Sequence, residues 1–161
     1  MKALTLTQPW ATLIAIGAKK IETRSWNTAY RGPLAINAAK GFPKEARDLL
    51  WKDFDFYAAF RPDHAAALNL AGVRLVPNAA ASAVSGQLPL GVVVATCRLA
   101  SIIPTSRVKG LTNQERAFGD YSPGRYAWIL EDVKPLAVPI PVKGALSLWE
   151  WNAPVDLEVE A

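Results

Sequence analysis

The strongest structural signal in the sequence is a run of β-branched and small apolar residues. Residues 92–96 are Val-Val-Val-Ala-Thr, inside a predicted strand over residues 90–103, and such residues favour the pleated, half-buried surface of a sheet. Shorter strand patterns cover residues 2–7, 19–26, 34–39, 126–130, 139–142 and 148–151. Many strands joined by turns and a few helices predict an α+β fold with a β-barrel, rather than a parallel α/β sheet.

Helical patterns lie between these strands. Residues 9–16 are apolar, with Thr7 as the expected N-cap and Gly17 as the expected end. Thr112 and Glu115 have the spacing of a capping box. Further helices are predicted over residues 44–60, 63–70 and 112–118. The side chains expected to face the barrel interior are Leu34, Ile36, Val93, Ala95 and Ile129.

The chain of 161 residues is expected to form a single domain over residues 1–161, because that length can bury a real core. A variable insertion is predicted around residues 61–89, with a flexible Ala-rich stretch at 79–83. The lone cysteine, Cys97, and lone histidine, His64, leave no intramolecular disulfide and no His/Cys zinc site. We expect no metal and no cofactor.

The start of the sequence has no secretory pattern, and no apolar run approaches the roughly 20 residues of a membrane helix. These features predict a cytoplasmic protein without a membrane partner. The net charge of +4 is a mild basic bias, and the six tryptophans supply flat faces for a core or for stacking bases. Charge and tryptophan content are compatible with a nucleic-acid partner without requiring one.

Lys19, Glu22 and Arg24 form the most polar cluster in the N-terminal half. Glu22 and Arg24 are two residues apart on the predicted strand, so they share one face with Trp26. Lys19 can join them only if the strand begins after Lys19 or carries a bulge. Glu22 would then lie between two cations, leaving positive groups for a phosphate or a base edge. The alternative is a surface salt-bridge network that binds no ligand.

Several other side chains are candidates for ligand contact. Gln8 has two donors and an acceptor, enough to recognise one base edge. Trp10 is either a core residue or a stacking face, and Trp26 is the better stacking candidate because it shares the face of Glu22 and Arg24. The remaining candidates are Ser25, Arg31 and Lys143.

Three groups of segments, in order along the chain, carry a resemblance to a known family. They are Gln8-Pro9-Trp10-Ala11; residues 17–26 with the pattern G-x-K-x-x-E-x-R, continuing to Arg31-Gly32-Pro33-Leu34; and a tail of Tyr126-Ala127-Trp128, Pro141-Val142-Lys143-Gly144 and Leu148-Trp149. Together they resemble the ASCH (activating signal cointegrator homology) domain. The resemblance implies a PUA-like β-barrel with a cleft beside the first helix and the signature strand, and an association with RNA or DNA binding.

One small bacterial branch of the family deacylates N4-acylated cytidines with a Lys, a Thr and a Glu. Lys19 lies at the position of that Lys, whereas Glu22 replaces the Thr and Val94 stands where the Glu would be. Because two of the three positions depart from the pattern, the resemblance does not favour this activity. Lys19 and Glu22 are therefore catalytic candidates only if the chain is an enzyme.

Three functions remain open at this point. The leading hypothesis is a module that binds RNA, DNA or a nucleotide. The first alternative is a hydrolase acting on a modified nucleoside or on RNA, and the second is a protein-interaction module. For the leading hypothesis we expect five side chains to converge on one solvent-accessible cleft: Gln8, Lys19, Glu22, Arg24 and Trp26.

Overall fold

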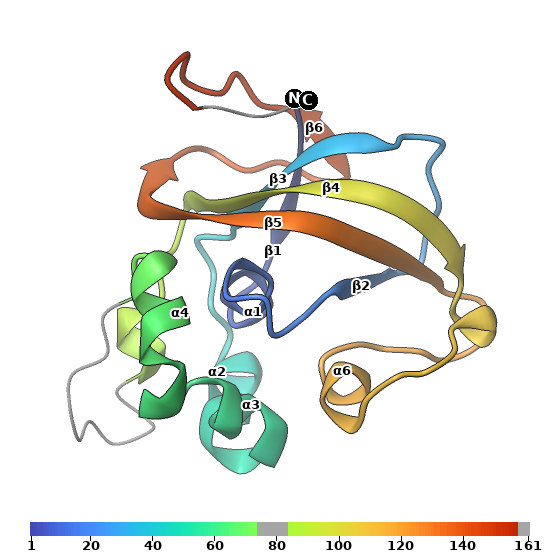
Figure 1. The fold of residues 1–161 in the computed structure, drawn as a ribbon, viewed down its shortest axis with the longest axis horizontal. Helices are drawn as coiled ribbons and strands as arrows, with labels where there is room; N and C mark the ends of the chain where they lie inside the picture. The colour runs from blue at the N-terminus through green and yellow to red at the C-terminus, as the bar shows by residue number, and fades with distance from the viewer. Residues whose placement is uncertain (74–83, 158–161) are drawn as a thin grey trace.

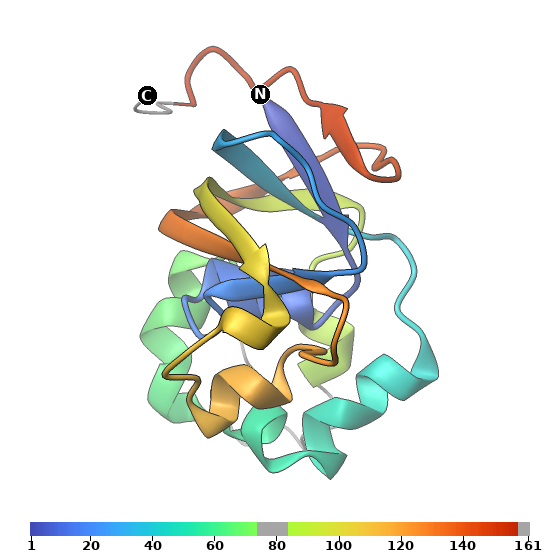
Figure 2. The ribbon, with the colours of Figure 1, turned by 90° about the vertical axis from the view of Figure 1, so that its right-hand side faces the viewer.

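The computed structural model describes residues 1–73 and 84–157, so the predicted flexible stretch at 79–83 lies outside the described residues. In this part of the chain, one mixed sheet of six strands curls into a half-barrel with the order β2-β5-β4-β3-β1-β6 (Figures 1 and 2). Its strands are β1 (Lys2–Leu6), β2 (Ile21–Arg24), β3 (Gly32–Ala38), β4 (Val92–Pro104), β5 (Tyr126–Pro141) and β6 (Leu148–Glu150). The curled sheet confirms the α+β, PUA-like fold class.

The helices gather below the sheet in Figure 1, with α1 nearest to it. They are α1 (Trp10–Ala15), α2 (Lys44–Lys52), α3 (Phe54–Ala59), α4 (Ala65–Leu70) and α6 (Asn113–Ala117), with single 3-10 turns at Pro62–His64, Ser85–Gln87 and Thr105–Arg107. Among the described helices, none combines the length and the apolar character that crossing a membrane requires.

The sheet buries apolar side chains on both of its faces. On the face toward α1, Leu34, Ile36 and Ala95 pack with Ile14 and Trp128. On the opposite face, the core residues are Ala3, Ala35, Val93 and Trp151. Two layers of packing therefore hold the central strands, and the two faces of the sheet can carry different surfaces.

Two of the residues predicted to face the interior are placed differently. Val93 lies on the face away from α1, because β4 contains one extra residue: Ile36 pairs with Ala95 and Asn37 pairs with Val93. This bulge at Val94 reverses the alternation of side chains on its far side. Ile129 is only half-buried, and its neighbours Trp128 and Leu130 take the interior positions.

The C-terminal half holds one long strand where two short ones were predicted. β5 runs without interruption from Tyr126 to Pro141, through Pro135 and Pro139. β2 pairs with only the first residues of β5, up to Ile129. Beyond that point, in the described chain, that side of β5 has no partner strand, so prolines are tolerated there as at a sheet edge.

The predicted long helix over residues 44–60 is two helices. Asp53 is extended, with φ −107° and ψ 127°, and its side chain accepts hydrogen bonds from the N–H groups of Asp55 and Phe56. Asp53 therefore ends α2 and caps α3 in the usual manner of an N-cap aspartate. At α1, the predicted cap Thr7 is wrong: the N-cap residue is Pro9, which makes no side-chain cap hydrogen bond. The side chain of Gln8 instead accepts from the Thr12 N–H at 3.1 Å.

Candidate functional site

The edge strand β2 is held at its first residue by a side chain from α6. Glu115 accepts hydrogen bonds from the N–H groups of Lys20 (3.0 Å) and Ile21 (3.1 Å). Thr112 caps α6 by accepting from the Glu115 N–H, as the capping-box spacing predicts. The Glu115 carboxylate, however, contacts β2 and so joins α6 to the sheet. Because β2 begins at Ile21, Lys19 precedes the strand and is free to turn toward Glu22.

Lys19 is completely buried and surrounded by acceptors. Its Nζ donates to the carbonyl oxygens of Ile21 (2.5 Å) and Phe118 (3.0 Å) and lies 3.5 Å from Glu22 Oε2. An ammonium group has three hydrogens, and three acceptors surround this one. Lys19 is thus a structural cation that joins β2 to the end of α6.

Glu22 lies between two cations, as the sequence predicts. Its Oε2 faces Lys19, and its Oε1 lies 3.6 Å from Arg24 Nη1. The register pairs Glu22 with Trp128, whose side chain is on the face toward α1. The carboxylate is therefore held on the inner face of the curled sheet, with only 9% of its side chain exposed.

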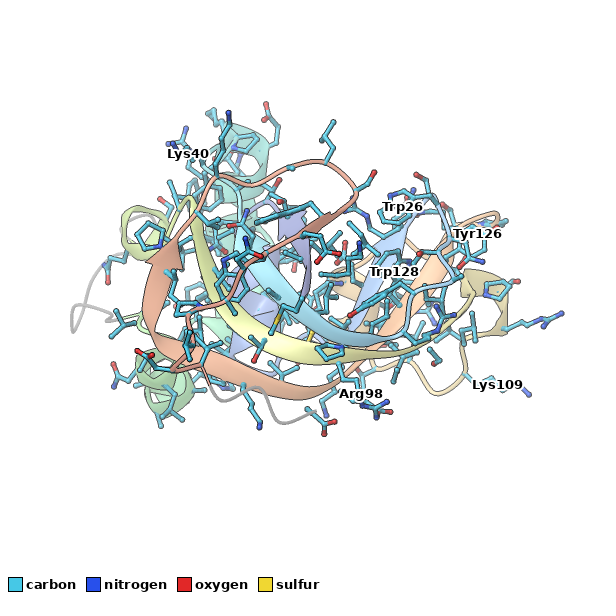
Figure 3. The ribbon with its side chains drawn as sticks, turned by 90° about the horizontal axis from the view of Figure 1, so that it is seen from above. Trp26, Lys40, Arg98, Lys109, Tyr126 and Trp128 are labelled. Atoms are coloured by element: carbon cyan, nitrogen blue, oxygen red, sulfur yellow. The ribbon has the colours of Figure 1, made fainter. Side chains whose placement is uncertain are left out.

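Arg24 and Trp26 form the accessible end of this cluster. The Arg24 side chain is 27% exposed, and its guanidinium carbon lies 5.6 Å from the centre of the Trp26 ring. Trp26 packs edge-on against Trp128, with ring centres 4.7 Å apart and planes at 84°. Figure 3 shows Trp26, Trp128 and Tyr126 together at one end of the sheet. The Arg24 guanidinium thus lies near the Trp26 ring, and the buried Glu22 and Trp128 contact the pair.

A cavity of about 350 Å³ opens beside Glu22. It is lined by Trp10, Glu22, Thr23, Ala117, Phe118, Gly119 and Asp120. Trp10 also packs edge-on against Phe56 at 5.9 Å, so the tryptophan belongs both to the core between helices and to the cavity wall. A side chain on Gly119 would lie 2.8 Å from the Tyr121 ring and 3.1 Å from Thr23 Cγ2, so a larger residue would force these neighbours to shift.

The loop after α6 supplies site residues that the sequence did not indicate. The Asp120 N–H donates to Thr23 Oγ1 at 2.9 Å, and Arg125 Nη2 donates to the Thr23 carbonyl at 3.3 Å. Arg125 also pairs with the Asp120 carboxylate at 3.3 Å. Burial, followed by the charges of Glu115 and Glu22, raises the pKa of Tyr121. These residues lie about a hundred positions from β2 in the sequence, and the capping box near Glu115 pointed to their segment.

Four predicted candidates lie apart from this cluster. Gln8 is fully buried, and its Nε2 donates to the Pro89 carbonyl at 2.8 Å, so both ends of its amide are used within the fold. Ser25 is exposed and follows the last residue of β2. Arg31 is exposed and donates to the carbonyl of Thr28. Lys143 lines a different cavity, together with residues on the opposite face of the sheet.

Within the described residues, no group of three or more His, Cys, Asp or Glu side chains is placed to hold a metal ion. A family model described as "ASCH domain" matches residues 4–140. Activating signal cointegrator 1 of Homo sapiens is 46% identical over 48 residues, which are 29% of this chain and 8% of that protein. The Mus musculus protein of the same name is 44% identical over 48 residues, with the same two shares. The match therefore spans less than a tenth of either relative.

Proposed function

The chain belongs to the ASCH domain family, whose members generally bind RNA, and from this premise we propose that it binds RNA through the β2 surface. The β2 surface consists of Glu22, Arg24 and Trp26. The observation that carries the proposal is the placement of the Arg24 guanidinium between the Glu22 carboxylate and the Trp26 ring, at 3.6 Å and 5.6 Å, while part of the side chain stays exposed.

This arrangement suits a nucleotide unit. A guanidinium offers a planar fork of donors that matches phosphate oxygens, and an indole offers a stacking face for any base. Glu22 and Trp26 hold Arg24 in one orientation before a ligand arrives, so less conformational freedom is lost on binding. The carboxylate neutralises part of the positive charge, and Arg24 can still use its outward N–H groups.

The cavity beside Glu22 supplies a place for one base. Its volume of about 350 Å³ falls in the range of small-ligand pockets. Glu22 is an acceptor that can receive a hydrogen bond from the amino group of a base. Trp10 adds an aromatic wall. A base in the cavity and its phosphate on Arg24 would place one nucleotide across the β2 surface.

The contacts of Lys19 favour binding over hydrolysis. A nucleophilic or basic lysine needs a free lone pair that faces the substrate. Lys19 is buried and directs its ammonium group at two backbone carbonyls and Glu22. Val94, at the position of the acidic residue of the amidohydrolase branch, packs in the apolar core with Trp128. We therefore propose binding without turnover.

Fluorescence anisotropy with a labelled mixed-sequence RNA, at several salt concentrations, tests the proposal. We expect Arg24→Ala to weaken binding about tenfold and to lower the salt slope by about one, because a phosphate contact releases a counterion. Trp26→Ala should weaken binding without changing the slope, because stacking releases no counterion. Arg47→Ala, an exposed arginine on α2, is the matched control and should bind as wild type does.

An Arg24→Ala protein that binds RNA like wild type at every salt concentration would remove the β2 surface from RNA binding. The same series with DNA of the same sequence establishes whether the ribose matters. Incubation with N4-acetylcytidine, followed by chromatography, tests turnover directly. Formation of a product would contradict the proposal that the protein binds without turnover.

A further inference from the structure

We propose that a second cavity, on the face of the sheet opposite α1, binds a single phosphorylated nucleoside. We call it the Asn37 cavity. Its volume is about 450 Å³, and it is lined by Thr5, Asn37, Ala39, Lys40, Gly91, Lys143, Gly144, Ala145 and Leu146. The proposal concerns a site separate from the β2 surface and does not depend on RNA binding there.

The floor of the cavity is fixed by strand pairing. β1 and β3 are parallel, and their register places Thr5 directly beside Asn37. Both residues alternate with Leu4 and Ile36, which face α1, so Thr5 and Asn37 point to the other side. Asn37 Nδ2 donates to Thr5 Oγ1 at 3.1 Å, and Trp149 Nε1 donates to the same oxygen at 3.1 Å.

These bonds leave an acceptor on Asn37 and a donor on Thr5 unused, besides the second N–H of the Asn37 amide. Asn37 is 1% exposed, and its Oδ1 has no hydrogen-bond partner in the described chain. Thr5 Oγ1 already accepts two hydrogen bonds, so its own hydroxyl hydrogen remains to be donated. A buried polar atom without a partner is rare in a folded protein. An acceptor beside a donor complements the edge of a nucleobase, which presents the same pair of groups in reverse.

The loop that follows β5 can pass close beside Asn37 only because it contains a glycine. A side chain at Gly144 would collide with the Asn37 amide and would lie 2.8 Å from Thr5 Oγ1. The loop therefore approaches the unused polar groups as closely as a backbone can. Ala145 and Leu146 follow in the lining, and with Ala39 they give the cavity apolar walls suited to a flat ring.

Two lysines at the rim of the cavity are the side chains expected to bind the phosphate. Lys40 follows the end of β3, and its aliphatic chain crosses Gly91, where a side chain would lie 2.8 Å from Lys40 Cγ. Lys143 lines the cavity from the loop after β5. Both are exposed, and neither makes an ion pair with another described residue. Buried groups for a base edge, apolar walls and two ammonium groups together match a nucleotide better than a bare anion.

The Asn37 cavity and the β2 surface occupy different parts of the molecule. Glu22 shares the inner face of the sheet with Trp128, whereas Asn37 shares the outer face with Ala35. In Figure 3, Lys40 lies at the opposite end of the sheet from Trp26 and Tyr126. A variant at one of the two sites should therefore affect ligand binding at that site alone.

Isothermal titration calorimetry of the full chain with the four nucleoside 5′-monophosphates tests the proposal. We expect at least one to bind, and its unphosphorylated nucleoside to bind about tenfold more weakly, because hydrogen bonds to charged groups are the stronger ones. The double variant Lys40→Ala/Lys143→Ala should bind the nucleotide more weakly than wild type by a similar factor. Lys109→Ala, an exposed lysine outside the cavity lining, is the matched control and should bind as wild type does.

Asn37→Leu removes the amide at nearly constant volume and should reduce nucleotide binding about tenfold or more. Circular dichroism verifies its fold. The lysine variants change exposed side chains, so they keep the proposal testable even if Asn37→Leu does not fold. If an RNA oligonucleotide competes with the mononucleotide, the natural ligand is a nucleotide within an RNA strand. A lack of competition would identify a free nucleotide, and both outcomes support the site.

Three results would overturn the proposal. The first is that no nucleoside monophosphate binds at millimolar concentration. The second is that inorganic phosphate binds as tightly as the nucleotide, which would reduce the cavity to an anion site. The third is that nucleotide binding disappears in Arg24→Ala but persists in the double lysine variant, which would place the nucleotide on the β2 surface.

Discussion

Lys19 shows how a single residue can resemble a catalytic group and yet serve the fold. Its ammonium group is buried against Glu22 and two carbonyl oxygens. Without the lysine, the buried Glu22 carboxylate loses one of its two cations, and the two carbonyl oxygens lose their donor. We expect Lys19→Met to lower the free energy of unfolding by about 3–5 kcal/mol, measured by urea denaturation. Lys20→Met, which changes the exposed neighbour, should have almost no effect.

The double variant Lys19→Met/Glu22→Gln separates charge from packing. In Lys19→Met, the buried Glu22 carboxylate keeps only Arg24 as a partner. Glu22→Gln removes that charge, so the double variant should be more stable than Lys19→Met alone. Equal stability of these two proteins would show that the loss comes from packing around the lysine chain and not from the carboxylate that loses its lysine.

Cys97 gives the stability of the protein a dependence on alkaline pH. Burial raises the pKa of its thiol from the ordinary value of 9.0 to about 12. Above pH 9 the unfolded chain loses this proton while the folded chain keeps it, so the stabilisation is complete below pH 9 and is lost as pH rises toward 12. We expect the Cys97 thiol to contribute a fall of about 1.4 kcal/mol per pH unit to the free energy of unfolding in that window.

Cys97→Ala is the control for this pH dependence. Its free energy of unfolding should decline less steeply above pH 9. A smaller decline should remain above pH 10, because burial also raises the pKa of Tyr121 in the folded chain. Identical slopes for the variant and the wild type, measured by urea denaturation at a series of pH values, would contradict the assignment to Cys97.

Single residues were predictable where a local period decides their position. Glu22 and Arg24 share a face because strand side chains alternate, and the 3.6 Å contact between them confirms it. Gln8 was not predictable, because its partner Pro89 lies 81 residues away. A polar side chain beside a helix gives no local sign of whether it faces solvent or a distant carbonyl.

Among the elements, β2 depends on α6 for its position. Glu115 provides acceptors for two N–H groups at the start of the strand. We expect Glu115→Ala to cost about 1–3 kcal/mol, because both donors lose their partner. Hydrogen exchange at the amides of Lys20 and Ile21 should accelerate, and RNA affinity should fall, because Arg24 belongs to the same short strand.

Glu45→Ala removes an exposed acid from the first turn of α2 and is the matched control. It should change neither the exchange of the β2 amides nor RNA affinity. Unchanged exchange at Lys20 and Ile21 in Glu115→Ala would show that pairing with β5 alone fixes the strand.

Elements were predicted well where the pattern was continuous and poorly where a neighbour decided the outcome. β3 and the core of β4 follow from their apolar runs. Asp53 divides a continuous helical pattern, since its short side chain bonds to the next turn more favourably than the helix can continue. The prolines of β5 suggested a break, yet they lie in the stretch that β2 does not pair. No local stretch of the sequence shows which part of β5 lacks a partner strand.

At the scale of the whole molecule, β6 and Trp151 cover the outer face of the sheet. Trp151 is 4% exposed and packs with Ala3, Ala35 and Val93. We expect Trp151→Ala to reduce the free energy of unfolding by about 3–5 kcal/mol in urea denaturation, through the cavity it leaves. Trp51→Ala, at an exposed tryptophan of α2, is the control and should cost far less. Similar losses would show that outer-face packing is not a major source of stability.

The candidate sites were predictable only in the part that lies in one segment of the sequence. Lys19, Glu22, Arg24 and Trp26 are close in sequence, so spacing and resemblance located them. Asp120 and Arg125 reach Thr23 from a distant loop. The Asn37 cavity draws on β1, β3 and the loop after β5, and its defining feature, an unpaired amide oxygen, exists only after these segments meet.

The N-terminal ammonium of Met1 donates to the Trp151 carbonyl at 2.9 Å, and Met1 and Leu157 pack on the same apolar cluster. The two ends of the fold are therefore neighbours across a strand pair. A short peptide could join them, and the chain could then be opened at an exposed turn such as Lys109-Gly110 without breaking any pairing of the sheet. The architecture is thus compatible with circular permutation, and with insertion of the whole unit into a surface loop of another protein.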